Sequence, residues 1–369
     1  MNDAVNWLLE NDQPSIRYHA LTQLLDKPKS DSDVKSTRDM IVKKGWAADL
    51  LSRQSDGGWW VTDESLYRPK YSASNWMLLV LADLGLNRTE PHIRKACELW
   101  IERFAKPDGG FGTDNAKKSE LCLVGNTARA LVQFSYADHP KVKRAFDWLV
   151  REQKENGGWH CWGKNGVLDA WEGMSAFAVY PRQKWTRSIR RAVERGAEFF
   201  LDRELCRQGA HYGPWFRFHY PVHYYYDLLV GLDFMTALGY GDDRRLDYAT
   251  RLLKEKRRPD GRWNLDAVHP DLEGSYANWY RKSPPNTICT RAGWRTEQSN
   301  YSHSPESTQA NRRLTSQILV TYVCANQPTH ARKEARSKSA ARTMIPTHEK
   351  AQPCPMEWQA ITTCFAASH

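Results

Sequence analysis

The chain has 369 residues, and its 53 Lys and Arg outnumber its 43 Asp and Glu, so the net charge is +10. A basic excess can indicate nucleic acid or an anionic surface. However, ten Lys or Arg and only five Asp or Glu lie from Pro284 onward, so half of the excess sits in that segment and the rest is spread over residues 1–283. We therefore expect no nucleic-acid partner.

Two features of the composition predict the compartment. The sequence has no apolar run long enough to span a membrane, and Met1 is not followed by a basic and then apolar leader. The eight cysteines have no paired spacing, as is usual for reduced thiols. We expect a soluble, unexported, cytoplasmic protein whose membrane contact is at most peripheral, and the oligomeric state stays open.

Glycine-containing turns recur at a nearly constant interval. Their first glycines lie 52, 48, 52 and 52 residues apart. An interval this regular indicates one supersecondary unit that is repeated about five times. The glycines are Gly57, Gly109, Gly157, Gly209 and Gly261.

Each unit carries two helical signals. The segment before a turn is amphipathic, which is typical of a helix with one solvated face, and the segment after a turn is apolar on nearly every side, which is typical of a buried helix. A further pair of short helices is expected between Val5 and Leu25. The amphipathic helices are expected at residues 91–104, 140–150, 188–201 and 244–253, and the buried ones at 75–82, 126–134 and 228–238.

These signals predict an all-α fold in which charged helices surround apolar ones, an α/α toroid of about five helix pairs over residues 1–283. From Pro284 onward the period stops, and residues 284–369 are expected to form an irregular tail. One explanation is disorder. Another is a shifted reading frame, because residues 288–298 can be encoded so that the next frame reads Phe-Ala-Leu-Glu-Pro-Gly-Gly-Glu-Pro-Ser.

Two turns belong to a longer pattern. Residues 54–60 and 153–159 both fit Gln-x-x-x-Gly-x-Trp, and residues 107–111 and 257–263 fit it less completely. This pattern resembles the QW motif of terpenoid cyclases and protein prenyltransferase β subunits. The resemblance covers about residues 40–283 and implies the α/α toroid of that superfamily. It does not imply one reaction, because the motif joins helices and does no chemistry.

The resemblance also implies where a site would lie, since the N-terminal ends of the inner helices face a central cavity in such a ring. Trp171 follows Gly157 by 14 residues, and His223 follows Gly209 by 14. Tyr71 has the same offset from the first turn glycine. We therefore expect a cavity rim of aromatic residues with carboxylates and an imidazole among them.

In a cyclase, a carboxylic acid protonates an alkene and aromatic faces stabilise the resulting cation. Asp169 is the expected acid, His223 a partner that tunes it, and Glu172 a further carboxylate of the rim. Asp227 lies four residues after His223, so the two would share one helix face. The expected substrate-binding residues are Tyr71, Trp171, Trp215, Phe216, Tyr224 and Tyr225.

Structural alternatives stay open for the same residues. Asp169 can cap a helix by accepting from its free N–H groups. The tyrosines can be ordinary core and rim packing, and the His223–Asp227 pair an ordinary intrahelical contact. Class II cyclases carry Asp-x-Asp-Asp at the acid, where this chain keeps the single carboxylate of Asp169.

A prenyltransferase would hold zinc through an Asp and a Cys two residues apart and a His at the next inner helix. Asp169 and His223 match in place, but Trp171 stands at the cysteine position and cannot bind zinc. We therefore expect neither a metal nor another cofactor.

The leading hypothesis is a terpenoid-cyclase-like protein that binds or cyclises an isoprenoid, an apolar small molecule, in an aromatic-lined cavity. A second hypothesis is a binding or scaffold protein that kept the ring without catalysis. A third is a carbohydrate-active lyase or hydrolase, because α/α toroids also bind sugars.

Overall fold

The computed structural model describes residues 3–161, 164–206, 212–266 and 287–288. Contacts between residues divide the chain after Gln327, and every described residue lies in the first of the two units. The expected turn at Gly209 and nearly all of the expected tail lie outside the described residues. The boundary at residue 283 therefore stays a prediction.

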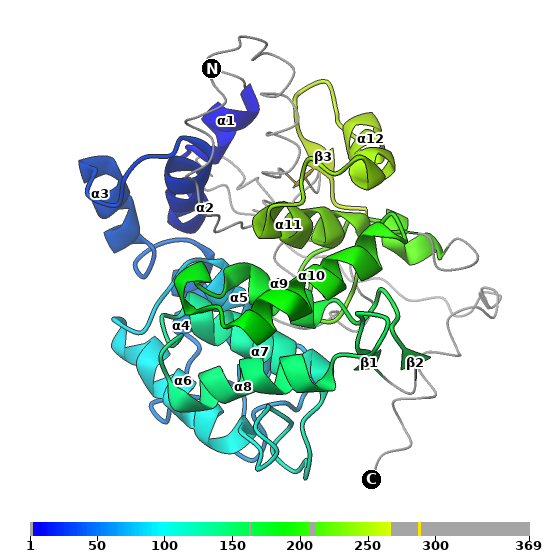
Figure 1. The fold of residues 1–369 in the computed structure, drawn as a ribbon. Helices are drawn as coiled ribbons and strands as arrows, with labels where there is room; N and C mark the ends of the chain where they lie inside the picture. The colour runs from blue at the N-terminus through cyan, green and yellow to red at the C-terminus, as the bar shows by residue number, and fades with distance from the viewer. Residues whose placement is uncertain (1–2, 162–163, 207–211, 267–286, 289–369) are drawn as a thin grey trace, which may run out of the picture. The chain divides into compact units, whose positions relative to one another are not determined.

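The described part of the chain is built from helices in two layers (Figure 1). Successive inner helices contact one another, α5 with α7, α7 with α9 and α9 with α11. Each outer helix packs on the inner helix that precedes it. The inner helices are α5 (Ser74–Asp83), α7 (Leu121–Gln133), α9 (Glu172–Val179) and α11 (Leu228–Leu238). The outer helices are α6 (Pro91–Phe104), α8 (Pro140–Glu152), α10 (Arg187–Leu201) and α12 (Asp247–Glu255).

This order of contacts is that of an α/α toroid, and the predicted all-α fold is confirmed. The bounds predicted for α6 and α11 are those observed. Burial also follows the prediction, since every residue of α5 except Asp83 is buried, whereas α8 buries only the face that carries Val142, Phe146 and Leu149.

Short elements complete the described fold. The N-terminal segment forms α1, α2, a π-helical turn, α3 and α4, and so contains the predicted short helix pair. Two antiparallel two-stranded pairs join β1 with β2 and β3 with β4. Their bounds are α1 (Asp3–Leu8), α2 (Pro14–His19), η1 (Ala20–Leu24), α3 (Ser32–Met40), α4 (Trp46–Leu51), β1 (His160–Cys161), β2 (Lys164–Asn165), η2 (Arg182–Lys184), η3 (Gly213–Phe216), η4 (Arg244–Leu246), β3 (Trp263–Asn264) and β4 (Thr287–Ile288).

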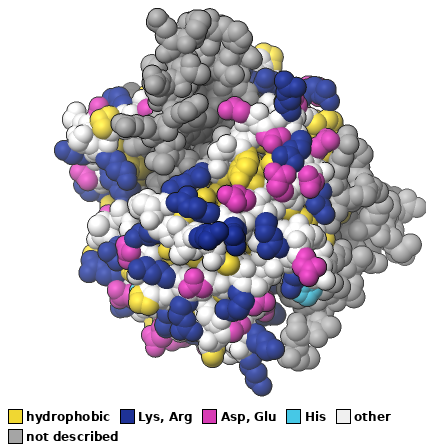
Figure 2. Space-filling model, in the orientation of Figure 1, with side chains coloured by type: hydrophobic (Ala, Val, Ile, Leu, Met, Phe, Trp, Pro, Cys, Tyr) yellow, Lys and Arg dark blue, Asp and Glu magenta, His cyan; other side chains and the backbone are white. Residues whose placement is uncertain are grey.

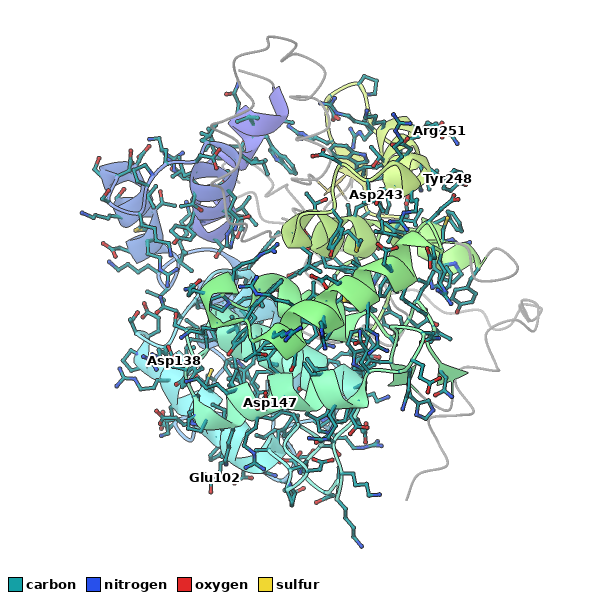
Figure 3. The ribbon with its side chains drawn as sticks, in the orientation of Figure 1. Glu102, Asp138, Asp147, Asp243, Tyr248 and Arg251 are labelled. Carbon is teal, nitrogen blue, oxygen red and sulfur yellow. The ribbon has the colours of Figure 1, made fainter. Side chains whose placement is uncertain are left out.

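Charged residues lie on the outer helices. Figure 3 labels Glu102 on α6, Asp147 on α8 and Arg251 on α12. On the face shown in Figure 2, side chains of both signs intermix. This distribution fits the expectation that the basic excess is dispersed over solvated helix faces.

The turn glycines adopt the left-handed backbone that only glycine enters without steric cost. The φ angles are +93° at Gly58, +102° at Gly109, +88° at Gly157 and +80° at Gly261. In the first unit the equivalent glycine is thus Gly58 and not its neighbour, which was the one used for the predicted period.

The tryptophan two residues after these glycines fixes each turn to the helix before it. The indole N–H groups of Trp60, Trp159 and Trp263 donate to carbonyl oxygens ten residues earlier in the chain, at distances of 2.8, 2.9 and 2.6 Å. In the second unit Phe111 takes this place and has no N–H to donate. In these three units the indole N–H therefore caps a carbonyl group near the C-terminal end of the helix before the turn.

The glutamine of the motif joins neighbouring units. Gln54 Nε2 donates to the oxygens of Gly58 and His92, at 3.0 and 3.1 Å. Gln153 Nε2 donates to those of Gly157 and Ala192, both at 2.8 Å. In each unit one amide thus ties its own turn to the first half of the next outer helix.

Candidate functional site

The segment between η3 and α11 carries four of the ten expected site residues in an irregular loop. The expected sharing of one helix face by His223 and Asp227 requires a helix that begins before His223, but α11 begins at Leu228, and Asp227 is its N-cap. Asp227 Oδ1 accepts from the backbone N–H of Val230 at 2.9 Å. His223 therefore lies outside the helix, with a left-handed φ of +43°.

The expected pairing of His223 with Asp227 on one helix face is wrong, because only Asp227 borders the helix. The contact of the Asp227 carboxylate is with His219 instead. Asp227 Oδ2 accepts from the backbone N–H of His219 at 3.1 Å and lies 2.7 Å from Nδ1 of the same residue. The side chain of Asp227 is fully buried and that of His219 is 8% exposed.

Rings from the first and fourth units of the repeat pack against one another in what we call the aromatic cluster, residues Tyr67, Tyr71, Trp76, His223 and Tyr224. Tyr71 stacks on His223 with ring centroids 5.4 Å apart. Trp76 meets His223 and Tyr224 edge-on, at 5.0 and 5.1 Å. These contacts hold segments together that lie about 150 residues apart in the sequence.

Hydroxyl groups at the edge of the aromatic cluster pair with each other. Tyr224 donates to the hydroxyl of Tyr67 at 2.7 Å, and the hydroxyls of Tyr71 and Tyr225 lie 3.1 Å apart. Burial raises the pKa of Tyr67 and Tyr224 well above the ordinary value. Both phenols therefore stay neutral and offer ring faces without a phenolate that could trap a cation.

Asp169 lies beside a different set of rings. Its Oδ1 accepts from the indole N–H of Trp215 at 2.8 Å, and Trp215 in turn meets Tyr226 edge-on at 5.6 Å. The N-cap of α9 is Trp171, so Asp169 does not hold the cap position that the structural alternative gave it. Trp171 Nε1 lies 3.5 Å from the backbone oxygen of Tyr224 and so links this region to the aromatic cluster.

The two remaining expected residues are positioned by packing. Glu172 lies in the first turn of α9 and is 1% exposed. A Cβ atom at Gly125 of α7 would lie 2.4 Å from the Cβ of Glu172, so this glycine allows the close approach of α7 and α9. Phe216 is half-buried and packs against the hydrophobic core.

Sequence analysis missed several residues of this interior. Tyr67 and Trp76 complete the aromatic cluster, and the buried Asn126 donates from Nδ2 to the backbone oxygen of His223 at 2.8 Å. Trp76 could have been predicted from the sequence, because it lies at the start of the inner helix of the first unit. In that unit only Tyr71 was named as a candidate.

Glu120 is a further carboxylate at the start of an inner helix, α7. Although the side chain of Glu120 reaches solvent, desolvation by the surrounding protein atoms raises the pKa of its carboxyl group. The positive charge of Lys106 opposes this shift. The pKa of Lys106 is lowered, chiefly by burial.

Among the residues that the structure describes, no group of three or more His, Cys, Asp or Glu side chains is arranged to hold a metal ion. In the same part of the chain, no helix has both the length and the apolar character needed to cross a membrane.

Fold and interior together define an α/α-toroid protein with a buried aromatic centre, and sequence comparison leads to the terpenoid cyclases. The chain is 27% identical over 159 residues to a probable squalene–hopene cyclase of Sinorhizobium fredii, which is 37% of this chain and 24% of the relative. A squalene–hopene cyclase of Bradyrhizobium diazoefficiens is 26% identical over 159 residues, 37% of this chain and 23% of the relative.

The chain thus spans about a quarter of the length of these curated relatives, and over that stretch the predicted resemblance to terpenoid cyclases is confirmed. No family model matches the sequence. A solved structure of a variant of the type II terpene cyclase MstE from Scytonema, in complex with merosterolic acid A, superposes with a TM-score of 0.40 and 15% identity over 69% of this chain and 71% of that one.

Proposed function

We propose that this protein is a terpenoid-cyclase-like protein that holds an isoprenoid, or a similarly apolar chain, in its interior. The observation that carries the proposal is the aromatic cluster, in which rings from the first and fourth units meet with their hydroxyl groups paired. Ring faces attract a carbocation through cation–π interactions. Neutral phenols do so without offering a strong nucleophile.

Asp169 is the proposed proton donor to the alkene. Its carboxyl group is held by the indole N–H of Trp215, and Trp171 two residues later contacts the backbone beside the aromatic cluster. The sequence similarity to squalene–hopene cyclases supports this class of chemistry. In this proposal Glu172 and His223 shape the interior, and Tyr225 orients Tyr71 through their paired hydroxyls.

Binding is tested by thermal unfolding of the full chain with squalene, geranylgeranyl diphosphate or an acidic oligosaccharide. A ligand at 100 times its dissociation constant adds about 2.7 kcal/mol to the free energy of unfolding. We expect this gain with an isoprenoid, and a smaller gain in Tyr224→Leu. The matched control is Tyr248→Leu on α12 (Figure 3), which leaves the aromatic cluster unchanged. Stabilisation by the oligosaccharide alone contradicts the proposal and favours a carbohydrate-active protein.

Catalysis is tested by Asp169→Asn. The amide oxygen of asparagine can still accept from Trp215, but asparagine cannot donate a carboxylic proton. We expect metal-independent turnover of the bound isoprenoid to be abolished while binding persists. Asp147→Asn on the outer face of α8 is the matched control. Unchanged turnover in Asp169→Asn would remove Asp169 from the mechanism.

A further inference from the structure

We propose that His219, held by Asp227, is the base that removes the proton at the end of the reaction. The proposal rests on the proposed cyclisation and adds a catalytic residue and its positioning partner. The observations behind it are the geometry of the buried pair and the state of the second ring nitrogen of His219.

The carboxylate of Asp227 joins His219 to the first turn of α11. One carboxylate oxygen accepts from both the backbone N–H and Nδ1 of His219, and the other accepts from the backbone N–H of Val230. Three donors thus fix a carboxylate that solvent does not reach. An ionised carboxylate can only accept hydrogen bonds, so Nδ1 of His219 carries the hydrogen.

Nε2 of His219 is then left with a lone pair. This atom is buried, and it has no hydrogen-bond partner among the described residues. A buried polar atom without a partner is destabilising, so its presence calls for an explanation. An imidazole whose Nδ1–H points at a buried carboxylate while Nε2 stays open is the arrangement by which a histidine accepts protons in hydrolases.

His219 also borders the site already described. Its ring meets that of Tyr225 edge-on at 5.7 Å, and the hydroxyl of Tyr225 lies 3.1 Å from that of Tyr71. Tyr226 lies within electrostatic reach of both acidic residues: burial and then the charges of Asp227, Cys206 and Asp169 raise the pKa of its hydroxyl. The proposed proton donor, Asp169, and the partner of the proposed acceptor, Asp227, therefore both act on Tyr226.

The step balances as follows. Nε2 of neutral His219 takes a proton from a carbon next to the cationic centre, and the electrons of that C–H bond become the π bond of an alkene. The resulting imidazolium is paired with Asp227. One proton enters from the acid and one leaves to the base, so the net reaction is an isomerisation. Solvent restores both groups.

The first test reads the histidine without requiring turnover. In the full chain labelled with ¹⁵N-histidine, the signals of His219 are those missing from His219→Gln. We expect a protonated Nδ1 and an unprotonated Nε2 at pH 8, and we expect saturating geranylgeranyl diphosphate or squalene to shift the Nε2 signal. In Asp227→Asn, which has one acceptor oxygen fewer, the preference for this tautomer should weaken. A protonated Nε2 in the free wild-type protein overturns the proposal.

The second test measures product formation. General-base catalysis contributes about 100-fold or more to a rate. We expect His219→Gln to lose at least that factor and to keep the thermal shift given by the isoprenoid. The matched control is His92→Gln at the exposed start of α6, which should keep wild-type turnover.

The outcomes separate the two proposals. If no isoprenoid stabilises the wild-type protein, the proposed function fails and the role of His219 fails with it. If an isoprenoid binds but His219→Gln forms product at the wild-type rate, only the role of His219 is overturned. A wild-type protein that binds the probes without converting any of them also overturns the role of His219.

Discussion

Tyr71 and His223 stack on each other at 5.4 Å, with their ring planes 26° apart, and both have a left-handed backbone. Their φ angles are +64° and +43°. Such a conformation costs a residue other than glycine about 1–2 kcal/mol, and it is found where the surrounding structure requires it. Tyr71 and His223, which stack the first unit on the fourth, therefore both have a strained backbone.

A pair of substitutions tests this strain. His223→Ala and His223→Gly both remove the ring, but only glycine adopts φ of +43° without strain. Glycine removes the backbone strain, but it also makes the unfolded chain more flexible, which offsets part of that gain. We therefore expect the glycine variant to have the same free energy of unfolding as the alanine variant, or a value up to about 1 kcal/mol higher. Chemical denaturation measures the difference. An alanine variant that is clearly the more stable would show that no strain is stored at this position.

The indole N–H of Trp60 is predicted to stabilise the first turn. Trp60→Phe removes the indole N–H that donates to the carbonyl of Leu50 at 2.8 Å, while the N–H of Arg53 still donates to it at 3.3 Å, so we expect a loss of about 1 kcal/mol in the free energy of unfolding. Trp59→Phe is the matched control, because the neighbouring Trp59 is half-buried. Denaturation curves of the two variants that coincide would contradict the role given to the indole N–H.

Gly157 is predicted to tolerate no side chain. Its φ is +88°, and a Cβ atom there would lie 2.2 Å from the backbone oxygen of Arg195 in α10. Gly157→Ala should therefore cost more than about 2 kcal/mol, because strain and overpacking add. Gly213→Ala is the control, because no described atom lies within 4 Å of the added Cβ. Thermal unfolding of both variants measures the contrast, and equal midpoints would refute it.

His19 makes stability depend on pH. Burial lowers the pKa of His19 from 6.5 to about 4, Arg38 adds to the lowering, and the hydrogen bond to Asp83 opposes it. The unfolded chain binds the proton first, so stability is complete above about pH 6.5 and falls as the pH decreases towards 4. The shift corresponds to about 3 kcal/mol.

The measurement for His19 is the free energy of unfolding between pH 7 and pH 4. His19→Gln should be less stable at pH 7 but should lose less on acidification than the wild type. The control is His92→Gln, whose side chain is exposed on α6. If the free energy of unfolding of His19→Gln falls with acidification as much as that of the wild type, groups other than His19 cause the pH dependence.

Much of the fold was predictable from local patterns. The bounds of α6 and α11 follow from hydrophobic periodicity, because a helix buries residues three and four positions apart whatever it packs against. The turn glycines were identified because a left-handed backbone favours one residue type. The shift of one residue at Gly58 arose where two glycines adjoin and only the backbone distinguishes them.

The candidate site was predictable only in part. Sequence offsets placed Tyr71, Trp171 and His223 at one level of the repeat. The structure stacks Tyr71 on His223, and Trp171 contacts the backbone of the residue after His223. The four-residue spacing of His223 and Asp227 was interpreted as one helix face, which requires a helix that begins before both residues. The helix begins later, at Leu228, so the carboxylate meets His219 instead.

The sequence by itself determined the period, the two helical layers and the residues that cap each turn, because each depends on contacts within one unit or between neighbouring units. The tertiary structure alone decided which histidine meets the buried carboxylate and which rings from the first and fourth units touch. Those contacts depend on a loop without periodicity and on segments more than 150 residues apart, whose approach is set by the packing of all the helices between them.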